Sequence, residues 1–258
     1  MPYPTLQITF LGTGTSSGVP MIGCDCEVCS SDNSKDRRLR SSILVQSKTT
    51  SIVVDSGPDF RQQMLRENVK RLDAVIFTHS HKDHIAGLDD VRAYNYYQQK
   101  PMQVYGTEFT LQRVVAEFNY AFSENKYPGT PSIHLNTIDE EVFLIGDILI
   151  QPIPVWHLRM PVMGFRFGNF TYITDANQID EESKEKVKGS KTLVINALRK
   201  QKHISHFTLN EACMLADELG VEQTYFTHIS HQLGLNDLIN NELANNKQLA
   251  FDGLKIIV

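Results

Sequence analysis

The residues best suited to chemistry form one short run, His-Ser-His-Lys-Asp-His, from His79 to His84. This run directly follows residues 73–77, which have the pattern of a buried strand, so it should begin at the carboxyl end of that strand. Imidazole nitrogens and a carboxylate oxygen are suitable ligands for zinc, manganese or iron. A solvated turn that happens to carry histidines is the alternative, but it does not account for this density of ligands. We therefore expect a metal site here.

Three single residues stand where later strand patterns break, namely His157, Asp175 and His228. Taken alone, a histidine or aspartate in such a place is more often structural than functional. A side chain at a strand end can nevertheless point out of the sheet edge toward a ligand. Because the histidine cluster at 79–84 already indicates a metal, we expect these residues to complete the same site.

Cysteines form a second cluster, since Cys24, Cys26 and Cys29 crowd together while Cys213 stands alone. An odd local cluster cannot pair off into disulfides, which favours a metal site in a reducing compartment. Reduced thiols without metal are the alternative. Cys213 falls on the apolar stripe of a helix predicted after Thr208, and we expect it to be buried and chemically inert.

Composition narrows the classes of function. The chain has 258 residues, 41% of them hydrophobic, which suits one large core. Its net charge of -5 gives no overall attraction to nucleic acid or to an anionic membrane. Neither an apolar run long enough to span a membrane nor a signal peptide is visible, so we expect a cytoplasmic protein without a membrane partner.

Strand patterns recur along the chain, and several are apolar almost throughout, which indicates burial on both faces. Amphipathic helices fall between them; the clearest follows Thr208, which forms a capping box with Glu211. This alternation predicts an α/β protein with two sheets packed face to face and helices outside. Since no linker or repeat is visible, we expect a single domain over residues 1–258. The predicted strands cover 7–11, 42–46, 51–55, 74–78, 103–105, 148–155, 162–167, 170–174, 192–196, 223–227 and 254–258.

The pattern H-x-H-x-D-H, followed by a distant His, Asp and His at strand ends, resembles the metallo-β-lactamase superfamily over nearly the whole chain. Leu11-Gly12-Thr13-Gly14, Asp55-Ser56-Gly57 and Phe251-Asp252-Gly253-Leu254 also match. Within the superfamily the chain is similar to the cyclic phosphate phosphodiesterase branch associated with the carbon-phosphorus lyase pathway. That likeness is carried by Gly18-Val19-Pro20, the C-x-C-x2-C cluster and Thr-His-Ile-Ser-His at 227–231. It implies the metallo-β-lactamase fold, an αββα four-layer sandwich of two mixed β-sheets with outer helices.

The resemblance also implies a binuclear active site of two divalent ions (Zn, Mn or Fe). Two cations held close together need a bridging carboxylate and hydroxide to screen their repulsion, and that hydroxide would be the nucleophile. In the implied assignment, one metal is held by His79, His81 and His157, the other by Asp83, His84 and His228, and Asp175 bridges them, with Asp83 counted as catalytic too.

The same resemblance names His231 as the fourth ligand that the three cysteines need for a structural zinc. His231 lies three residues after His228, so this zinc would fix the turn that carries an active-site ligand. Asp55 has no ligand role, and we expect it either to orient the histidine loop or to form a plain strand-end turn.

His206 precedes the predicted helix and matches a non-ligand histidine of the branch. It is either an ordinary structural histidine or a catalytic residue that contacts phosphate or protonates the leaving oxygen. His134 and His203 have no motif around them, and we interpret both as structural.

For each of three further features, the sequence allows two interpretations. Basic residues at 37–40 are solvated or ion-paired, or they contact phosphate. Tyrosines at 94–97 pack in the core or line the substrate pocket. Segment 109–137 is a lid or a long surface connection.

These features predict a two-metal hydrolase, a phosphodiesterase for small cyclic or activated phosphodiesters such as a phosphoribosyl cyclic phosphate. Its partner would be that small-molecule substrate, with no long nucleic acid, and a homodimer is left open. The alternatives are a thiolester or lactone hydrolase of the same superfamily and a non-catalytic binding protein of a cofactor pathway. A nuclease that matures transfer RNA is disfavoured by the acidic balance and by the absence of a basic, glycine-rich arm.

Overall fold

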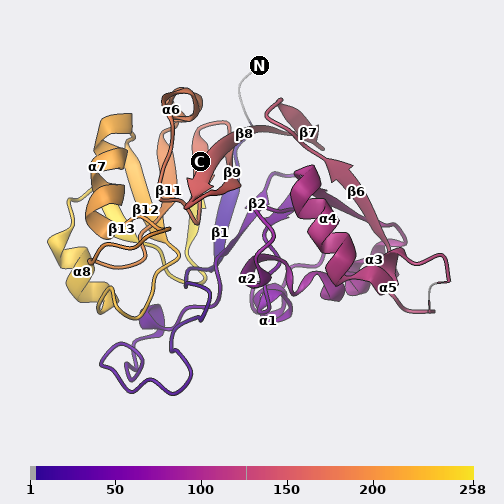
Figure 1. The fold of residues 1–258 in the computed structure, drawn as a ribbon, viewed down its shortest axis with the longest axis horizontal. Coiled ribbons are helices and arrows are strands. Elements are labelled where there is room, and N and C mark those ends of the chain that lie inside the picture. The colour runs from indigo at the N-terminus through magenta and orange to yellow at the C-terminus, as the bar shows by residue number, and fades with distance from the viewer. Residues whose placement is uncertain (1–3, 126) are drawn as a thin grey trace.

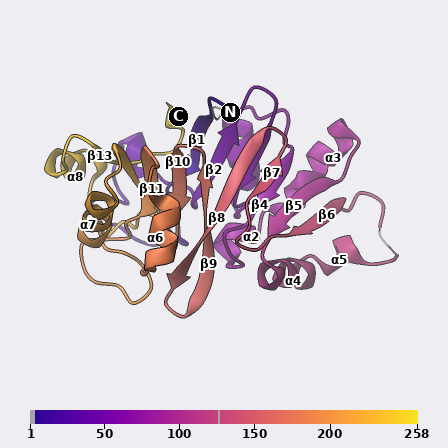
Figure 2. The same cartoon turned by 90° about the horizontal axis from the view of Figure 1, so that it is seen from above.

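The computed structural model describes residues 4–125 and 127–258, which form two seven-stranded mixed sheets packed face to face (Figures 1 and 2). In the first sheet the strand order is β14-β1-β2-β3-β4-β5-β6, and in the second it is β13-β12-β11-β10-β9-β8-β7. The strands of the first sheet are β14 (Lys255–Ile257), β1 (Gln7–Gly12), β2 (Ser42–Gln46), β3 (Ser51–Val54), β4 (Ala74–Ile76), β5 (Met102–Gly106) and β6 (Ile133–Thr137). Those of the second are β13 (Lys247–Leu249), β12 (Gln223–Thr227), β11 (Thr192–Asn196), β10 (Phe170–Ile173), β9 (Met160–Phe167), β8 (Ile148–His157) and β7 (Phe143–Ile145).

Three apolar clusters define four layers, as the sequence predicted. The central cluster lies between the sheets and includes Ile8 and Ile52 from one and Phe165 and Tyr172 from the other. A second cluster packs the first sheet against α1, α3 and α4, and a third packs the second sheet against α6, α7 and α8. In Figure 1 these helix groups lie on opposite sides of the sheets. The helices are α1 (Phe60–Arg66), α2 (Lys82–Ile85), α3 (Arg92–Gln98), α4 (Glu108–Glu117), α5 (Asn119–Phe122), α6 (Glu181–Val187), α7 (Leu209–Leu219) and α8 (Asn236–Glu242), with 3-10 turns at Ser34–Asp36 and Leu88–Val91.

Every strand that the sequence predicted is present, with ends that agree to within two residues, but β6, β7 and β13 were missed. They are short strands near or at the sheet edges, and β6 is buried on neither face, so they lack the apolar pattern of a buried strand. Segment 109–137 contributes most of α4, all of α5 and β6, with residue 126 outside the described residues. It is therefore largely structured, and its last strand pairs with β5.

The capping box at Thr208 and Glu211 is present at the start of α7. Cys213 on this helix is only half-buried, which corrects the expectation of a fully buried thiol. Its neighbours Ala212 and Leu215 occupy the core positions, and Cys213 packs at the margin of that cluster. Among the described helices, none combines the length and apolar character that crossing a membrane requires.

Candidate metal centre

Strand ends from both sheets meet at one edge, and the chain turns sharply there. Asp55 after β3, Asp175 after β10 and His228 after β12 all have left-handed backbone, with φ of 65°, 55° and 55°. Asp and His tolerate this conformation better than most residues do, although it carries a cost in backbone strain. In each case the turn ends the strand and directs the side chain into the space between the sheets' edges.

The loop after β4 carries the histidine cluster and packs closely on the turn after β3. A Cβ at Gly57 would lie 2.0 Å from the carbonyl oxygen of Asp83, and a Cβ at Gly87 would lie 2.1 Å from that of Gly57. Only glycine fits at these two contacts. The sequence Asp55-Ser56-Gly57, which resembles the superfamily motif, therefore positions the histidine loop at 79–84 by allowing close contact between the two backbones.

Asp175 is the centre of the site. Its Oδ2 lies 3.4 Å from His84 Nε2, 3.4 Å from His206 Nε2 and 3.9 Å from His79 Nε2. Its Oδ1 lies 3.0 Å from His228 Nδ1. One buried carboxylate thus faces four imidazoles from three segments of the chain, because His79 and His84 belong to the same loop.

These residues fit a pair of divalent cations. The buried ring nitrogens His79 Nε2, His84 Nε2 and His228 Nδ1 make no hydrogen bond, which is costly unless a ligand is bound there. The potential ligands fall into three groups, each with its donor atoms within 4.8 Å of one another, and all three groups include Asp175. The groups are Asp83, His84, Asp175 and His228; His79, His81 and Asp175; and His157, Asp175 and His206.

The structure therefore brings together every active-site residue that the sequence singled out. His157 was expected beside His79 and His81, and its ring centroid lies 5.3 Å from that of His81. It lies closer, at 4.5 Å, to the ring of His206. The division of ligands between two metals stays a prediction, and His206 is as near to Asp175 as His84 is.

Outer hydrogen bonds orient the potential ligands. Asp55 accepts from His84 Nδ1 at 2.8 Å and from the backbone N and hydroxyl of Thr78 at 2.9 and 2.8 Å. His157 Nδ1 donates to the carbonyl oxygen of Ser205 at 2.8 Å, and Thr15 Oγ1 lies 3.2 Å from His228 Nε2. Such partners fix ring orientation and raise ligand basicity. Asp55 thus has the orienting contacts expected of it.

Thr15, Thr78 and Ser205 were not anticipated from the sequence. Each lies within one or two residues of a motif identified in the sequence, and this proximity is the only feature of the sequence that could have indicated a role at the site. Which side chain meets which ring depends on contacts between distant segments, as Thr15 and His228 illustrate.

Burial and charge shift several ionisation equilibria at the site. Burial disfavours the charged form of Asp175, but the imidazoles of His228 and His84 outweigh it and hold the pKa of Asp175 well below its usual value. Burial raises the pKa of Asp55, against the opposing effect of His84. Burial also lowers the pKa of His206 to about 4, so its ring is neutral near pH 7. Burial disfavours the charged form of His84, but the neighbouring carboxylates outweigh it and raise the pKa of His84 well above its usual value. Because metal binds neutral imidazole, a metal at this site would have to displace a proton from His84.

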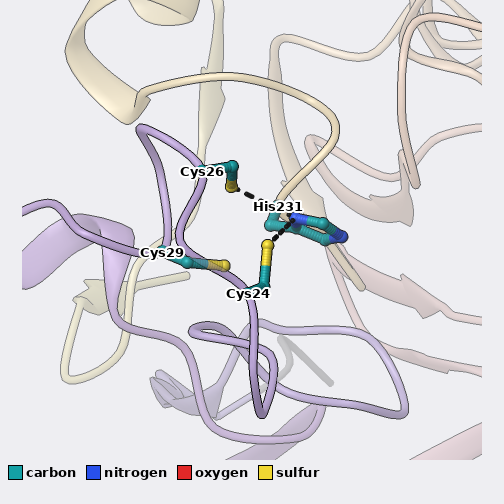
Figure 3. Close-up of side chains that lie close together, drawn as sticks. All are labelled: Cys24, Cys26, Cys29 and His231. Carbon is teal, nitrogen blue, oxygen red and sulfur yellow. Dashed lines mark hydrogen bonds between the residues drawn. The ribbon is translucent and has the colours of Figure 1, made fainter.

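The thiol cluster forms a separate potential site, shown in Figure 3. Cys24, Cys26, Cys29 and His231 present donor atoms within 4.8 Å of one another. The sulfurs of Cys24 and Cys26 lie 3.4 and 3.3 Å from His231 Nδ1. This Cys3His set suits tetrahedral zinc with no open position.

The thiols are not equivalent. Contact with His231 lowers the pKa of Cys26 to about 6, whereas burial raises the pKa of Cys29 to about 11. Thiolates are the zinc-binding form, so zinc would have to displace a proton from Cys29. The turn from His228 to His231 is pinned at Ile229, which exchanges backbone hydrogen bonds with Thr13 and Thr15.

Two of the three arginines in the basic run at 37–40 are engaged by protein groups. Arg38 is buried and donates to Thr13 Oγ1 at 2.8 Å, and Arg40 pairs with Asp59 at 3.1 Å. These contacts favour the interpretation of Arg38 and Arg40 as internally paired residues over the interpretation as phosphate ligands.

Of the three tyrosines in α3, only Tyr94 packs in the core, where its hydroxyl donates to a backbone carbonyl. Tyr96 and Tyr97 are exposed.

Comparison with known proteins identifies the family of the chain. Residues 50–229 match the family model described as "Beta-lactamase superfamily domain". The chain belongs to this superfamily of metal-dependent hydrolases. It superposes on the crystal structure of a diphosphatase from the PhnP family with a TM-score of 0.93 and 39% identity, over 98% of this chain and 97% of that one. Within the superfamily it is a member of the PhnP-like branch.

Two other relatives are informative. A protein named octanoyltransferase from Porphyromonas gingivalis is 35% identical over 98% of this chain, yet the chain spans about half of that protein, 52% of its length. Zinc-bound PqqB from Methylobacterium extorquens superposes with a TM-score of 0.79 at 21% identity, over 97% of this chain and 99% of that one. At that identity the likeness concerns the fold alone.

We expect Cys26→Ser and His231→Ala each to remove one zinc per chain, lower Tm and lower kcat/KM about tenfold with unchanged substrate ranking. The zinc would be lost because a closed site needs all four ligands, and the turn bearing His228 would loosen without losing its ring. His228→Ala should instead release a catalytic metal and cost at least about a hundredfold. Elemental analysis and thermal melting test this.

Cys213→Ser is the matched control, because Cys213 is a half-buried thiol on α7 outside the cluster. It should change neither zinc content nor activity. Equal metal loss and equal kinetic damage in His228→Ala and His231→Ala would contradict the separation of the two sites.

Proposed function

We propose that the chain is a two-metal phosphodiesterase that hydrolyses small cyclic or otherwise activated phosphodiesters. The observation that carries this proposal is the sharing of Asp175 by three ligand groups, since a shared carboxylate suits two adjacent cations. Similarity to a diphosphatase of the PhnP family supports attack at phosphorus.

Two divalent ions, when bound, would activate water near neutral pH and stabilise negative charge on a phosphoryl oxygen. The chain's own residues would orient this chemistry. Asp175 supplies the central negative charge, while Asp55 and Ser205 hold the rings of His84 and His157 in place. His206 reaches the same space from a different loop and is placed to carry a proton to the leaving oxygen.

The substrate is proposed to be small. Arg38 and Arg40 are already engaged by protein groups, and the chain as a whole is acidic. A long nucleic acid is held through many phosphate contacts to lysine and arginine. A phosphodiester with a small alcohol component needs only the site itself.

A thiolester or lactone hydrolase is the second candidate, because the same nucleophile attacks a carbonyl carbon. The relative named octanoyltransferase is the specific observation in its favour, since its name denotes acyl transfer. The chain matches only about half of that protein, so the acyl-transfer activity of the whole relative need not belong to the matched half.

A turnover panel on protein of measured metal content separates the two candidates. The substrates are ribose 1,2-cyclic phosphate 5-phosphate, bis(p-nitrophenyl) phosphate, a diphosphate diester, p-nitrophenyl phosphate and an S-octanoyl thiolester. We expect kcat/KM for the best diester to exceed that for the monoester and the thiolester by about a hundredfold or more. Preference for the thiolester would establish the second candidate, and preference for the monoester would refute the first.

A further inference from the structure

We propose that His203 is a positioning residue, which holds the ring of His206 with its proton on Nδ1 and its Nε2 lone pair directed at the metal centre. No motif surrounds His203, and the sequence indicated only a structural role. The proposal concerns how His206 is prepared for catalysis and so rests on the proposed function for its kinetic consequence.

The proposal is based on a compact cluster of polar atoms around Nδ1 of His206. The Nδ1 atoms of His203 and His206 lie 3.2 Å apart. Ser205 Oγ lies 3.3 Å from the first and 3.1 Å from the second. The backbone N–H of Ser205 donates to His203 Nδ1 at 3.4 Å.

These contacts favour one placement of the protons on the two rings. Because His203 Nδ1 accepts from a backbone N–H, it carries a lone pair and no proton. Two bare nitrogens 3.2 Å apart would repel, so the proton between the rings belongs to His206 Nδ1. Ser205 Oγ–H can then donate to His203 while its oxygen accepts from His206. His206 is therefore the Nδ1–H tautomer, and its Nε2 is bare.

The opposite edge of the His206 ring, which carries Nε2, faces the carboxylate of Asp175. This Nε2 lies 3.4 Å from Asp175 Oδ2, so with the proton on Nδ1 two acceptors face each other, and a proton donor that reaches both atoms is favoured at this edge of the ring. The ring is stacked on His228, with centroids 4.9 Å apart at 12°, and meets His157 edge-on at 4.5 Å. These two neighbouring rings thus help to hold His206 in this orientation.

The loop that presents His203 is closed by backbone hydrogen bonds. Leu198 N donates to Phe207 O at 3.0 Å and Leu209 N donates to Arg199 O at 3.1 Å. Asn177 Nδ2 donates to the carbonyl oxygen of Ile204 at 3.2 Å, which ties the middle of the loop to the turn after β10. His203 is therefore held against His206 by the fold.

The tautomer determines what His206 can do. A bare Nε2 can take up the proton that a water molecule releases when it becomes the hydroxide nucleophile, a proton that bulk solvent could otherwise accept. His206 can then deliver that proton to the leaving oxygen as its bond to phosphorus breaks. The Nε2–H tautomer would instead donate to Asp175 and could accept no proton at Nε2.

The test reads the tautomer directly from two-bond 1H–15N spectra of histidine side chains, in metal-free and zinc-loaded protein at slightly alkaline pH. His203→Leu removes the acceptor, so Ser205 Oγ–H is free to donate to His206 Nδ1 and the Nε2–H form should appear. His203→Asn should preserve the wild-type tautomer, since its Oδ1 can replace Nδ1 as acceptor. The exposed His134 of β6, changed to leucine, is the matched control.

In kinetics with the best phosphodiester, His203→Leu should lower kcat about tenfold to a hundredfold, leave KM nearly unchanged, and be rescued by His203→Asn. A wild-type His206 protonated on Nε2, or a tautomer unaffected by His203→Leu, would overturn the proposal even if phosphodiesters are hydrolysed. A tautomer shift in protein that hydrolyses no phosphodiester would uphold the positioning role and refute the proposed function.

Discussion

Replacing Asp175 with asparagine should lower phosphodiesterase kcat/KM at least about a thousandfold and release catalytic metal. Asparagine keeps the size of the side chain and tolerates the left-handed backbone at this position, so only the negative charge is removed. That charge lies within 3.4 Å of ring nitrogens of His84, His206 and His228. Metal analysis and steady-state kinetics measure both effects.

Asp180→Asn is the control for the Asp175 substitution, because Asp180 is an exposed helix cap at α6 and asparagine caps equally well. It should leave metal content, Tm and turnover unchanged. If Asp175→Asn retained both catalytic metals and wild-type turnover, the shared-carboxylate centre would be wrong.

Removing His206 should reveal its role through the leaving group. If it carries a proton to the departing oxygen, His206→Ala should slow substrates with a poor leaving group, such as a ribose hydroxyl, by about a hundredfold to ten-thousandfold. Substrates that release p-nitrophenolate need no proton at that oxygen and should be slowed little. The comparison requires only the two ester types and a measurement of metal content.

His134→Ala, at an exposed position of β6, should slow neither ester type. Equal slowing of both types by His206→Ala would assign the residue to phosphate binding or packing. Loss of metal would instead count His206 among the ligands, which its grouping with His157 and Asp175 allows geometrically.

The layered fold was predictable because its central strands are apolar almost throughout and leave little choice of environment. Strands such as β3, β10 and β11 are buried at every position, which fixes them between layers. Strand β6 could not be predicted in the same way, because its pairing with β5 is decided by backbone hydrogen bonds at an edge and leaves no apolar pattern.

The sequence by itself determined the ligand types of both candidate sites, because a dense run of histidines and a cluster of three cysteines have few other uses. Tertiary structure decided how distant residues share one centre. Asp175 and His228 become neighbours only because the left-handed turns after β10 and β12 direct their side chains to the same edge. The pairing of His203 with His206 also depends on how their loop is closed by backbone hydrogen bonds, and residue type and spacing alone do not contain that closure.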